Sequence, residues 1–446
     1  MMQYVHFNAD KYLVGRDGKP FYLTGINFTA GYVCSDFWAD WRPESIRRDL
    51  EQIHSLGLNG VRIPLVWNTF EPEEGKPDPV ILERFETFLG WCRELEIYVM
   101  PWCLVGVATE EYDLSWRNGR SYFFDESMIQ AAENHLQMLG RRFREHEMIL
   151  CWDICDEPEW YSRWSDKDVL PYPTDKFTHW VDRMAKAFHS ADPNHLVTLG
   201  FGHIATANYG MDLRDCADKL DFMAVTAYPN TYGEPLSTPR PGYELLYHLD
   251  MNRRYRPSFL CESPGWSNTM AAEESIAHLY NTTLYSSWLH NSCGVMPWVF
   301  SFYSEDIVTR RGSTCLEIHP EEPWFGIVDE DRNVLQKGRV LEAFAHKTQE
   351  LNAVSYKMPQ ARTALIVPRG YHRMDYGSIA GRMIAVHSAL CAADIPVDMV
   401  WYDELDPEKY PFAILSMLSH EVTSTDWRMM AEYVEKGGTL LNFCIR

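Results

Sequence analysis

The chain has 446 residues, a formal net charge of −22 at pH 7, and a composition of 46% apolar, 14% aromatic and 23% charged residues. This length predicts about two domains, one of them large enough for a barrel of about 250 residues. The composition excludes a disordered chain. The acidic charge would repel phosphate backbones and anionic lipid, so we expect neither nucleic acid nor a membrane surface as a partner. Sixteen tryptophans and twenty-four tyrosines favour a neutral, saccharide-like ligand, although the same rings also suit a core.

The start of the chain lacks the basic residues and apolar run of a secretory signal. No segment approaches about 18 consecutive apolar residues, the length that would indicate a membrane-spanning helix. We therefore expect a cytoplasmic protein. The eleven cysteines are scattered singly without a C-x-x-C pair, which predicts reduced thiols, no disulfide framework and no metal site.

Short apolar runs alternate with amphipathic stretches from the N-terminus to about residue 350. Eight strands are predicted, at 21–27, 60–65, 97–104, 148–154, 195–200, 222–228, 257–262 and 293–300. Helices separate most of them, and those at 43–57 and 79–96 begin with proline. This order predicts an α/β fold, a (β/α)8 TIM barrel over residues 1–350. An open doubly wound sheet is the alternative, but no G-x-G-x-x-G follows the first strand.

The remaining chain, residues 361–446, predicts a smaller flavodoxin-like α/β domain. Its strands are expected at 361–370, 396–401, 412–417 and 439–443, with helices at 377–395 and 424–438 between them. Residues 354–360 are the predicted linker. Because the sequence ends directly after a strand, without the helix that should cover it, we expect this domain to be incomplete.

Two glutamates follow predicted barrel strands at the same end. Glu157 comes after the fourth strand and precedes Pro158, which should hold Glu157 in an extended conformation. Glu262 ends the seventh strand. Either residue alone would more often be a solvated loop residue, but the carboxyl ends of barrel strands open on one face. A protonated and an ionised carboxyl together can cleave a glycosidic bond, without a metal or another cofactor.

The motifs around these glutamates, "WDICDEP" (152–158) and "LCESPGW" (260–266), resemble those of the retaining barrel glycoside hydrolases, the superfamily that includes families 5 and 42. The resemblance covers roughly residues 20 to 345. It implies that Glu157 is the general acid/base and Glu262 the nucleophile that forms a covalent glycosyl-enzyme. The two carboxyl groups should then lie about 5 to 5.5 Å apart.

Three more positions follow from this resemblance. Arg62 in "GVRIP" resembles the arginine that keeps the nucleophile ionised. Tyr228 in "VTAYP" resembles the tyrosine whose hydroxyl bonds the nucleophile, and Trp298 in "VMPWVF" resembles the tryptophan beneath the sugar. All three are predicted to line the substrate site. Without the resemblance, Tyr228 and Trp298 would also suit a core.

The sequence departs from family 5 at three places. Asp156 stands where an asparagine usually contacts the sugar's 2-hydroxyl, and an ionised aspartate can only accept hydrogen bonds. Trp102 and Thr226 stand near the places of two common histidines. We expect Asp156 and Trp102 to bind substrate, in a divergent branch whose sugar preference is open.

The C-terminal domain resembles the amidotransferase-like domain of family 42 β-galactosidases and of a cytoplasmic branch of family 5 β-mannosidases, where it supports trimers. No nucleophilic cysteine elbow is present, so amidotransferase activity is not expected. The resemblance implies a homo-oligomer, with a trimer as the expected form.

Long aromatic loops after the third, fourth, sixth and eighth strands, such as 110–126 and 159–173, should wall a pocket. A pocket favours release of one terminal sugar. We therefore predict an exo-β-mannosidase acting on short oligosaccharides such as mannose-β-1,4-N-acetylglucosamine. A family 42 type β-galactosidase is the alternative, and a barrel that binds sugar without cleaving it is the second.

Overall fold

The computed structural model describes residues 4–104, 113–158, 175–202, 211–228, 240–308, 321–351, 359–371, 376–417 and 421–442. Most of the predicted aromatic loops, residues 354–358 of the predicted linker, and Cys315 and Cys444 lie outside these ranges. Among the described residues, nine cysteines are free thiols, and no helix is long and apolar enough to cross a membrane.

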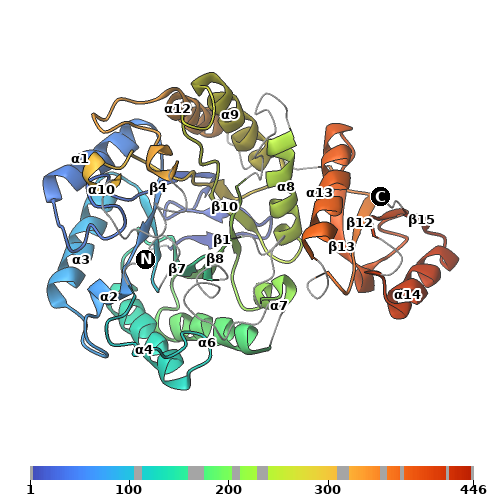
Figure 1. The fold of residues 1–446 in the computed structure, drawn as a ribbon, viewed down its shortest axis with the longest axis horizontal. Coiled ribbons are helices and arrows are strands. Elements are labelled where there is room, and N and C mark those ends of the chain that lie inside the picture. The colour runs from blue at the N-terminus through green and yellow to red at the C-terminus, as the bar shows by residue number, and fades with distance from the viewer. Residues whose placement is uncertain are drawn as a thin grey trace.

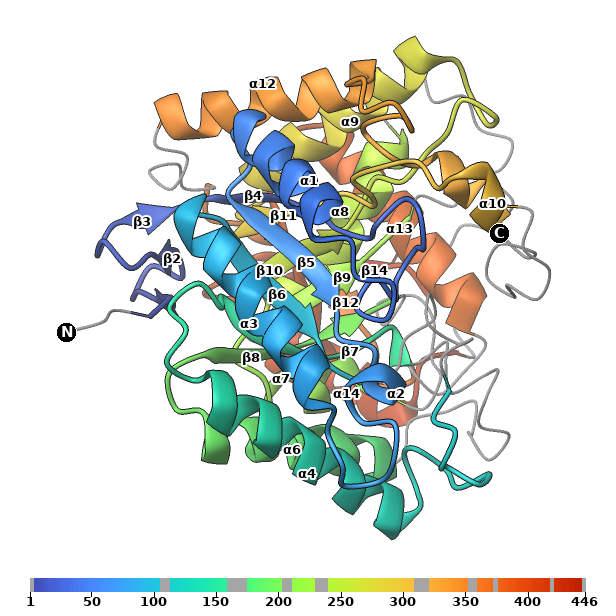
Figure 2. The same cartoon turned by 90° about the vertical axis from the view of Figure 1, so that its left-hand side faces the viewer.

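Eight parallel strands form a closed barrel, which confirms the predicted (β/α)8 fold (Figures 1 and 2). The strands are β4 (Leu23–Asn27), β5 (Gly60–Pro64), β6 (Tyr98–Trp102), β7 (Cys151–Asp156), β8 (Leu196–Phe201), β9 (Met223–Thr226), β10 (Ser258–Glu262) and β11 (Gly294–Val295). The eighth strand is shorter than the predicted 293–300, because beyond Val295 the chain keeps only single backbone bonds to β4, through Pro297 and Phe300. The fourth strand, β7, begins and ends later than the predicted 148–154, and its last residue is Asp156.

Helices surround the barrel (Figure 2). They are α1 (Pro43–Ser55), α2 (Trp67–Phe70), α3 (Pro79–Glu94), α4 (Glu126–Phe143), α6 (Asp175–Ala191), α7 (Leu213–Ala217), α8 (Arg240–Arg253), α9 (Glu273–Leu289), α10 (Glu305–Val308), the 3₁₀ turn η2 (Glu322–Trp324) and α12 (Gln336–Glu350). The predicted starts of α1 and α3 are confirmed. At α3, the side chain of Asp78 accepts from the backbone N–H of Val80 (2.8 Å) and of Ile81 (3.3 Å), which satisfies two donors that the first turn leaves open.

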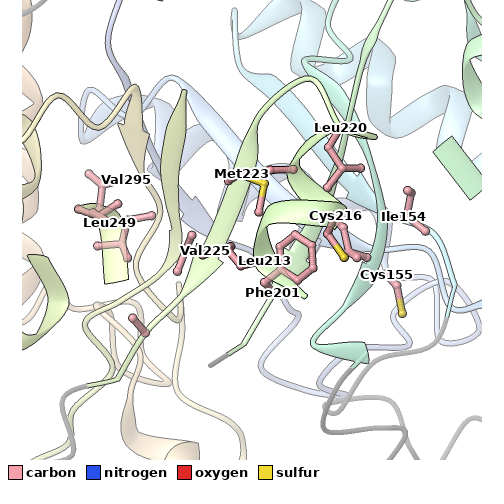
Figure 3. Close-up of a cluster of buried hydrophobic side chains, with 14 of the residues drawn as sticks. Ile154, Cys155, Phe201, Leu213, Cys216, Leu220, Met223, Val225, Leu249 and Val295 are labelled. Carbon is pink, nitrogen blue, oxygen red and sulfur yellow. The ribbon is translucent and has the colours of Figure 1, made fainter. Parts of the chain in front are cut away.

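Apolar side chains form two layers, one on the outer face of the strands and one inside the barrel. The outer one packs the strands against the helices, and Figure 3 shows part of it, where Phe201 and Val225 lie near Leu213 of α7. The inner one fills the amino-terminal half of the barrel, with Met100, Phe259 and Met296 among its members. It is closed from below by a small antiparallel sheet of β1 (His6–Phe7), β2 (Leu13–Val14) and β3 (Pro20–Phe21). Polar side chains inside the barrel therefore gather at its carboxyl end.

The C-terminal unit is a four-stranded parallel sheet in the order β13-β12-β14-β15, beside the barrel in Figure 1. Its elements are β12 (Thr363–Val367), α13 (Tyr376–Ala392), β13 (Val397–Trp401), the 3₁₀ turn η4 (Tyr402–Glu404), β14 (Phe412–Leu415), α14 (Ser424–Glu435) and β15 (Thr439–Asn442). A smaller α/β unit after the barrel is thus confirmed.

The two units meet where α13 packs against α8 of the barrel (Figure 1). The buried hydroxyls of Tyr247 and Tyr371 lie 2.7 Å apart across this contact. The ring of His387, also buried, lies 2.8 Å from the carboxylate of Asp250. Buried polar pairs of this kind hold only in one relative placement, so α8 fixes the C-terminal unit on the barrel.

We expect Gly25→Ala to destabilise the barrel. Gly25 faces Gly60 of the next strand, and an added Cβ would lie 2.5 Å from the Gly60 carbonyl oxygen and 2.8 Å from Met296 Cε. Overpacking of this kind costs about 1–3 kcal/mol, which a lower denaturant midpoint would show. Gly90→Ala in α3 is the control, because nothing lies within 4 Å of its added Cβ, and it should stabilise by about 0.5–1 kcal/mol. Equal midpoints for the two variants would contradict this account.

Candidate active site

Both strands that carry the predicted catalytic glutamates are irregular near their carboxyl ends. In β7 the pairing with β8 shifts register between Asp153 and Asp156. In β10 the pairing with β9 shifts between Leu260 and Glu262. A bulge bends a strand and re-aims the side chains that follow it. Here the shifts occur just before Glu157 and at Glu262.

Arg62 on β5 is the centre of a buried charge cluster. Its Nε donates to Asp153 (2.9 Å), and Nη2 lies 2.8 Å from Asp153 and 2.6 Å from Asp156. Its Nη1 donates to Glu262 (2.5 Å) and to the amide oxygen of Asn27 (3.3 Å). These four hydrogen bonds and the ion pair of Nη2 with Asp153 involve all three nitrogens of the guanidinium.

The Arg62 side chain is 0% exposed. Its guanidinium is committed to carboxylates and an amide of the protein, and its charge acts on those carboxylates. That Arg62 lines the substrate site stays a prediction. Asn27 on β4 supports the guanidinium, since its Nδ2 donates to the backbone carbonyls of Cys261 (2.7 Å) and Met296 (3.0 Å). Asn27 therefore links three strands beneath the charge cluster.

Asp153 is a member of the site that the sequence analysis missed. It is fully buried, and its second oxygen accepts from the backbone N–H of Gly200 (2.8 Å). Burial raises its pKa to about 6, although Arg62 lies beside it. The sequence could have indicated this role, because Asp153 is an acid in the middle of an apolar barrel strand, and such an acid needs a buried cation as its partner.

Glu157 lies just beyond β7, and its carboxyl accepts a hydrogen bond from the hydroxyl of Thr226 on β9. Burial and the neighbouring Asp156 carboxylate raise its pKa to about 8, against the lowering effects of Thr226 and Arg62. The prediction of an extended Glu157 is wrong, since its φ is +43°. A non-glycine residue in this region is strained by about 1 kcal/mol or more, so the packing around Glu157 overrides the preference that Pro158 imposes.

Glu262 has stronger partners than Glu157. Besides Arg62, it accepts from the hydroxyl of Tyr228 at 2.9 Å. Burial raises the pKa of Tyr228, so this hydroxyl stays protonated and donates. Burial, together with the Asp156 and Glu157 carboxyls, raises the pKa of Glu262 well above its usual range, against the lowering effects of Arg62 and Tyr228. Because the two glutamates repel each other, we expect the first proton to go to the one with the weaker donor. This agrees with the prediction of Glu157 as the protonated acid and Glu262 as the carboxylate, which stays a prediction.

The aromatic residues lie in two places. Trp298 is 3% exposed and packs in a small cluster with Val299 and Phe325, against which Tyr228 also packs. Trp102 ends β6, in register with Pro64 and Asp153, and is buried. The structure thus places Trp298 beside Tyr228, and Trp102 beside the strand of Arg62.

Asp156 is 3% exposed and has one oxygen committed to Arg62. Its predicted contact with a sugar hydroxyl stays a prediction, as do the substrate contacts of Tyr228, Trp298 and Trp102. Within the described ranges, no group of three or more His, Cys, Asp or Glu side chains is arranged to hold a metal ion.

Residues 14–232 match the family model described as Cellulase (glycosyl hydrolase family 5). This stretch contains Glu157 and the Arg62 cluster except Glu262, which lies beyond it. No curated protein sequence matches the chain significantly.

Solved structures resemble the chain over nearly all of its length. The exo-β-1,4-mannosidase Op5Man5 from Opitutaceae bacterium strain TAV5 has a TM-score of 0.83 at 20% identity, over 98% of this chain and 79% of that one. A family 5 subfamily 18 protein from Streptomyces cattleya, in complex with Manβ1-4GlcNAc, has a TM-score of 0.75 at 17% identity, over 94% and 98%. A β-galactosidase from Rahnella sp. R3 has a TM-score of 0.73 at 16% identity, over 95% and 70%. At these identities the likeness concerns the fold.

We expect Glu157→Gln to remove a pH-dependent loss of stability. A carboxyl whose pKa rises on folding to about 8 stabilises the folded state fully at pH 4 and loses this contribution as the pH rises through 8. Thermal unfolding should show that, between pH 5 and pH 8.5, the free energy of unfolding of the variant rises by about 1–2 kcal/mol relative to that of the wild type. This value is reduced because the side chain is partly exposed. Glu83→Gln, at an exposed site on α3, is the control. A wild-type-to-variant difference that stays constant with pH would contradict the assignment.

Proposed function

We propose that the chain, whose residues 14–232 match the model of glycosyl hydrolase family 5, is a retaining exo-β-glycosidase, specifically a β-mannosidase. It would release terminal mannose from short oligosaccharides such as mannose-β-1,4-N-acetylglucosamine. The observation that carries the proposal is the unequal pair of glutamates. Glu157 bonds one neutral hydroxyl, whereas Glu262 bonds a guanidinium and a phenol.

The first chemical step follows from this inequality. The Glu262 carboxylate attacks the anomeric carbon while Glu157 protonates the departing oxygen, which yields a glycosyl ester on Glu262 and a free aglycone. Arg62 and Tyr228 hold the attacking carboxylate in one orientation. Both its oxygens have partners, so little reorganisation is needed before attack.

The second step reverses the roles. Once Glu262 is a neutral ester, it no longer repels a charge on Glu157, so the ionised Glu157 becomes the general base for water. Water adds at the anomeric carbon from the side that the aglycone left, the ester bond breaks, and Glu262 returns as a carboxylate. Two displacements retain the anomeric configuration.

The choice of mannose has support from the resemblance in fold to an exo-β-1,4-mannosidase and to a protein solved with Manβ1-4GlcNAc. A family 42 type β-galactosidase stays the alternative, because proteins of that activity share the fold too. A barrel that only binds sugar is disfavoured, since burying four carboxyls around one arginine costs stability without serving binding. The cytoplasmic location, the amidotransferase-like character of the C-terminal unit and the trimer stay predictions.

We expect the protein to hydrolyse p-nitrophenyl β-mannoside faster than the β-galactoside or β-glucoside. The kcat/KM values for the three substrates, together with the NMR signal of the first-formed sugar anomer, test both specificity and retention. A preference for the β-galactoside would support the alternative. Binding of a mannosyl disaccharide without any hydrolysis would overturn the enzyme assignment.

We expect the two glutamate variants to fail differently. Glu262→Ala should lower kcat by about 10³-fold or more, and azide should restore turnover to give a glycosyl azide of inverted configuration. Glu157→Ala should lose about 10²–10⁴-fold on substrates with poor leaving groups but retain more activity on a 2,4-dinitrophenyl glycoside, and its azide product should have retained configuration. Glu51→Ala, an exposed glutamate on α1, is the control. The same loss in both catalytic variants without rescue would refute the roles.

A further inference from the structure

Lys337 has an unusual environment for a lysine. It is the second residue of α12 and is 1% exposed. Its Nζ donates to three backbone carbonyl oxygens, those of Trp266 (2.7 Å), Phe325 (2.9 Å) and Trp324 (3.1 Å). Three acceptors use all three N–H groups of an ammonium ion, whereas a neutral amine has only two to donate.

Local preferences oppose a charged lysine at this place. The amino-terminal turn of a helix favours negative charge, so the dipole of α12 disfavours the cation. Burial also lowers the pKa of Lys337 to about 7, and the Glu273 carboxylate at the start of α9 acts against this lowering. The aromatic ring of Phe302 faces the ammonium at 5.8 Å. A cation that both the helix dipole and burial disfavour is expected where its contacts have a functional role.

The three carbonyls belong to two segments that border the glutamate site. Trp266 is four residues beyond Glu262, in the segment after β10. Trp324 and Phe325 lie in the segment that follows β11. Lys337 is therefore a bridge that joins these two segments to α12, and neither segment can move away without leaving an N–H or a carbonyl unpaired in a buried place.

These segments contact Tyr228 directly. The ring of Phe325 lies in the cluster of Trp298, against which Tyr228 packs. A Cβ added to Gly265 would lie 2.7 Å from Cε1 of Tyr228 and 2.9 Å from Cδ2 of Phe325, so the backbone at Gly265 touches both rings. Tyr228 in turn donates to Glu262. A continuous series of contacts thus runs from Lys337 to the carboxylate.

We propose that Lys337 is a positioning residue of the hydrolytic site. Its ammonium group ties the segments after β10 and β11 together and so keeps the Tyr228 hydroxyl on Glu262. This inference rests on the proposed glycosidase function. Lys337 touches neither glutamate and acts through backbone carbonyls and the Phe325 and Tyr228 rings.

Replacing Lys337 with methionine tests the proposal, because methionine has a similar length and no donor. We expect kcat on the best aryl glycoside to fall at least tenfold, with a smaller change in KM, in a variant that stays folded by circular dichroism. Lys347→Met, at a partly exposed site on the same helix, is the control and should stay within twofold. A folded Lys337→Met enzyme with wild-type kcat would overturn the proposal. A wild-type protein without glycosidase activity would instead overturn the function on which it rests.

A second pair of measurements separates donation from mere packing. Lys337→Ala should regain activity with ethylammonium, which carries three N–H groups, and not with tetramethylammonium, which has the same charge and none. Equal effects of the two salts would overturn the role of the hydrogen bonds. Gly265→Ala tests the same contacts if the Lys337 variants do not fold. Its Cβ should displace Tyr228 and lower kcat at least tenfold, and an unchanged kcat would refute the coupling.

Discussion

The buried guanidinium of Arg62 is the constraint on which the active site depends. It lies inside the barrel without exposure, and its three nitrogens are shared among Asp153, Asp156, Glu262 and Asn27. These partners come from three strands besides its own. Removing one member of such a buried ion cluster costs about 3–5 kcal/mol, because the others stay buried without compensation. The stability of the closed barrel and the assembly of the site are therefore coupled.

The cluster holds more acids than its one cation can neutralise. Asp153, Asp156, Glu157 and Glu262 face a single positive charge, so at least one proton stays bound near neutral pH. The hydrogen-bond partners of each carboxyl influence which of them keeps this proton. Among the described residues, the Glu157 carboxyl has only the hydroxyl of Thr226 as a hydrogen-bond donor, and its pKa of about 8 reflects burial and the nearby Asp156. The aspartate at position 156, where family 5 usually has asparagine, thus adds a charge that helps to keep Glu157 protonated as an acid.

The apolar layer, the segments bound by Lys337 and the C-terminal unit surround the charge cluster and contribute to the structure in different ways. The apolar layer below it closes the amino-terminal half of the barrel, so the charged groups face the carboxyl end alone. On one side, the segments held by Lys337 support Tyr228. The C-terminal unit packs on the outside through α8, and among the described residues it supplies no hydrogen bond to the four acids.

The sequence by itself determined the barrel and the pair of glutamates, because alternating apolar strands and amphipathic helices leave few ways to bury a core, and acids after buried strands must face the open end. It did not show Asp153 as a partner of Arg62, nor the positive φ of Glu157. Those features depend on the register between β7, β8 and β10, where one residue of shift changes the face on which a side chain lies. Only the tertiary structure decided how Arg62 is shared among its partners, since this follows from distances between residues far apart in the chain.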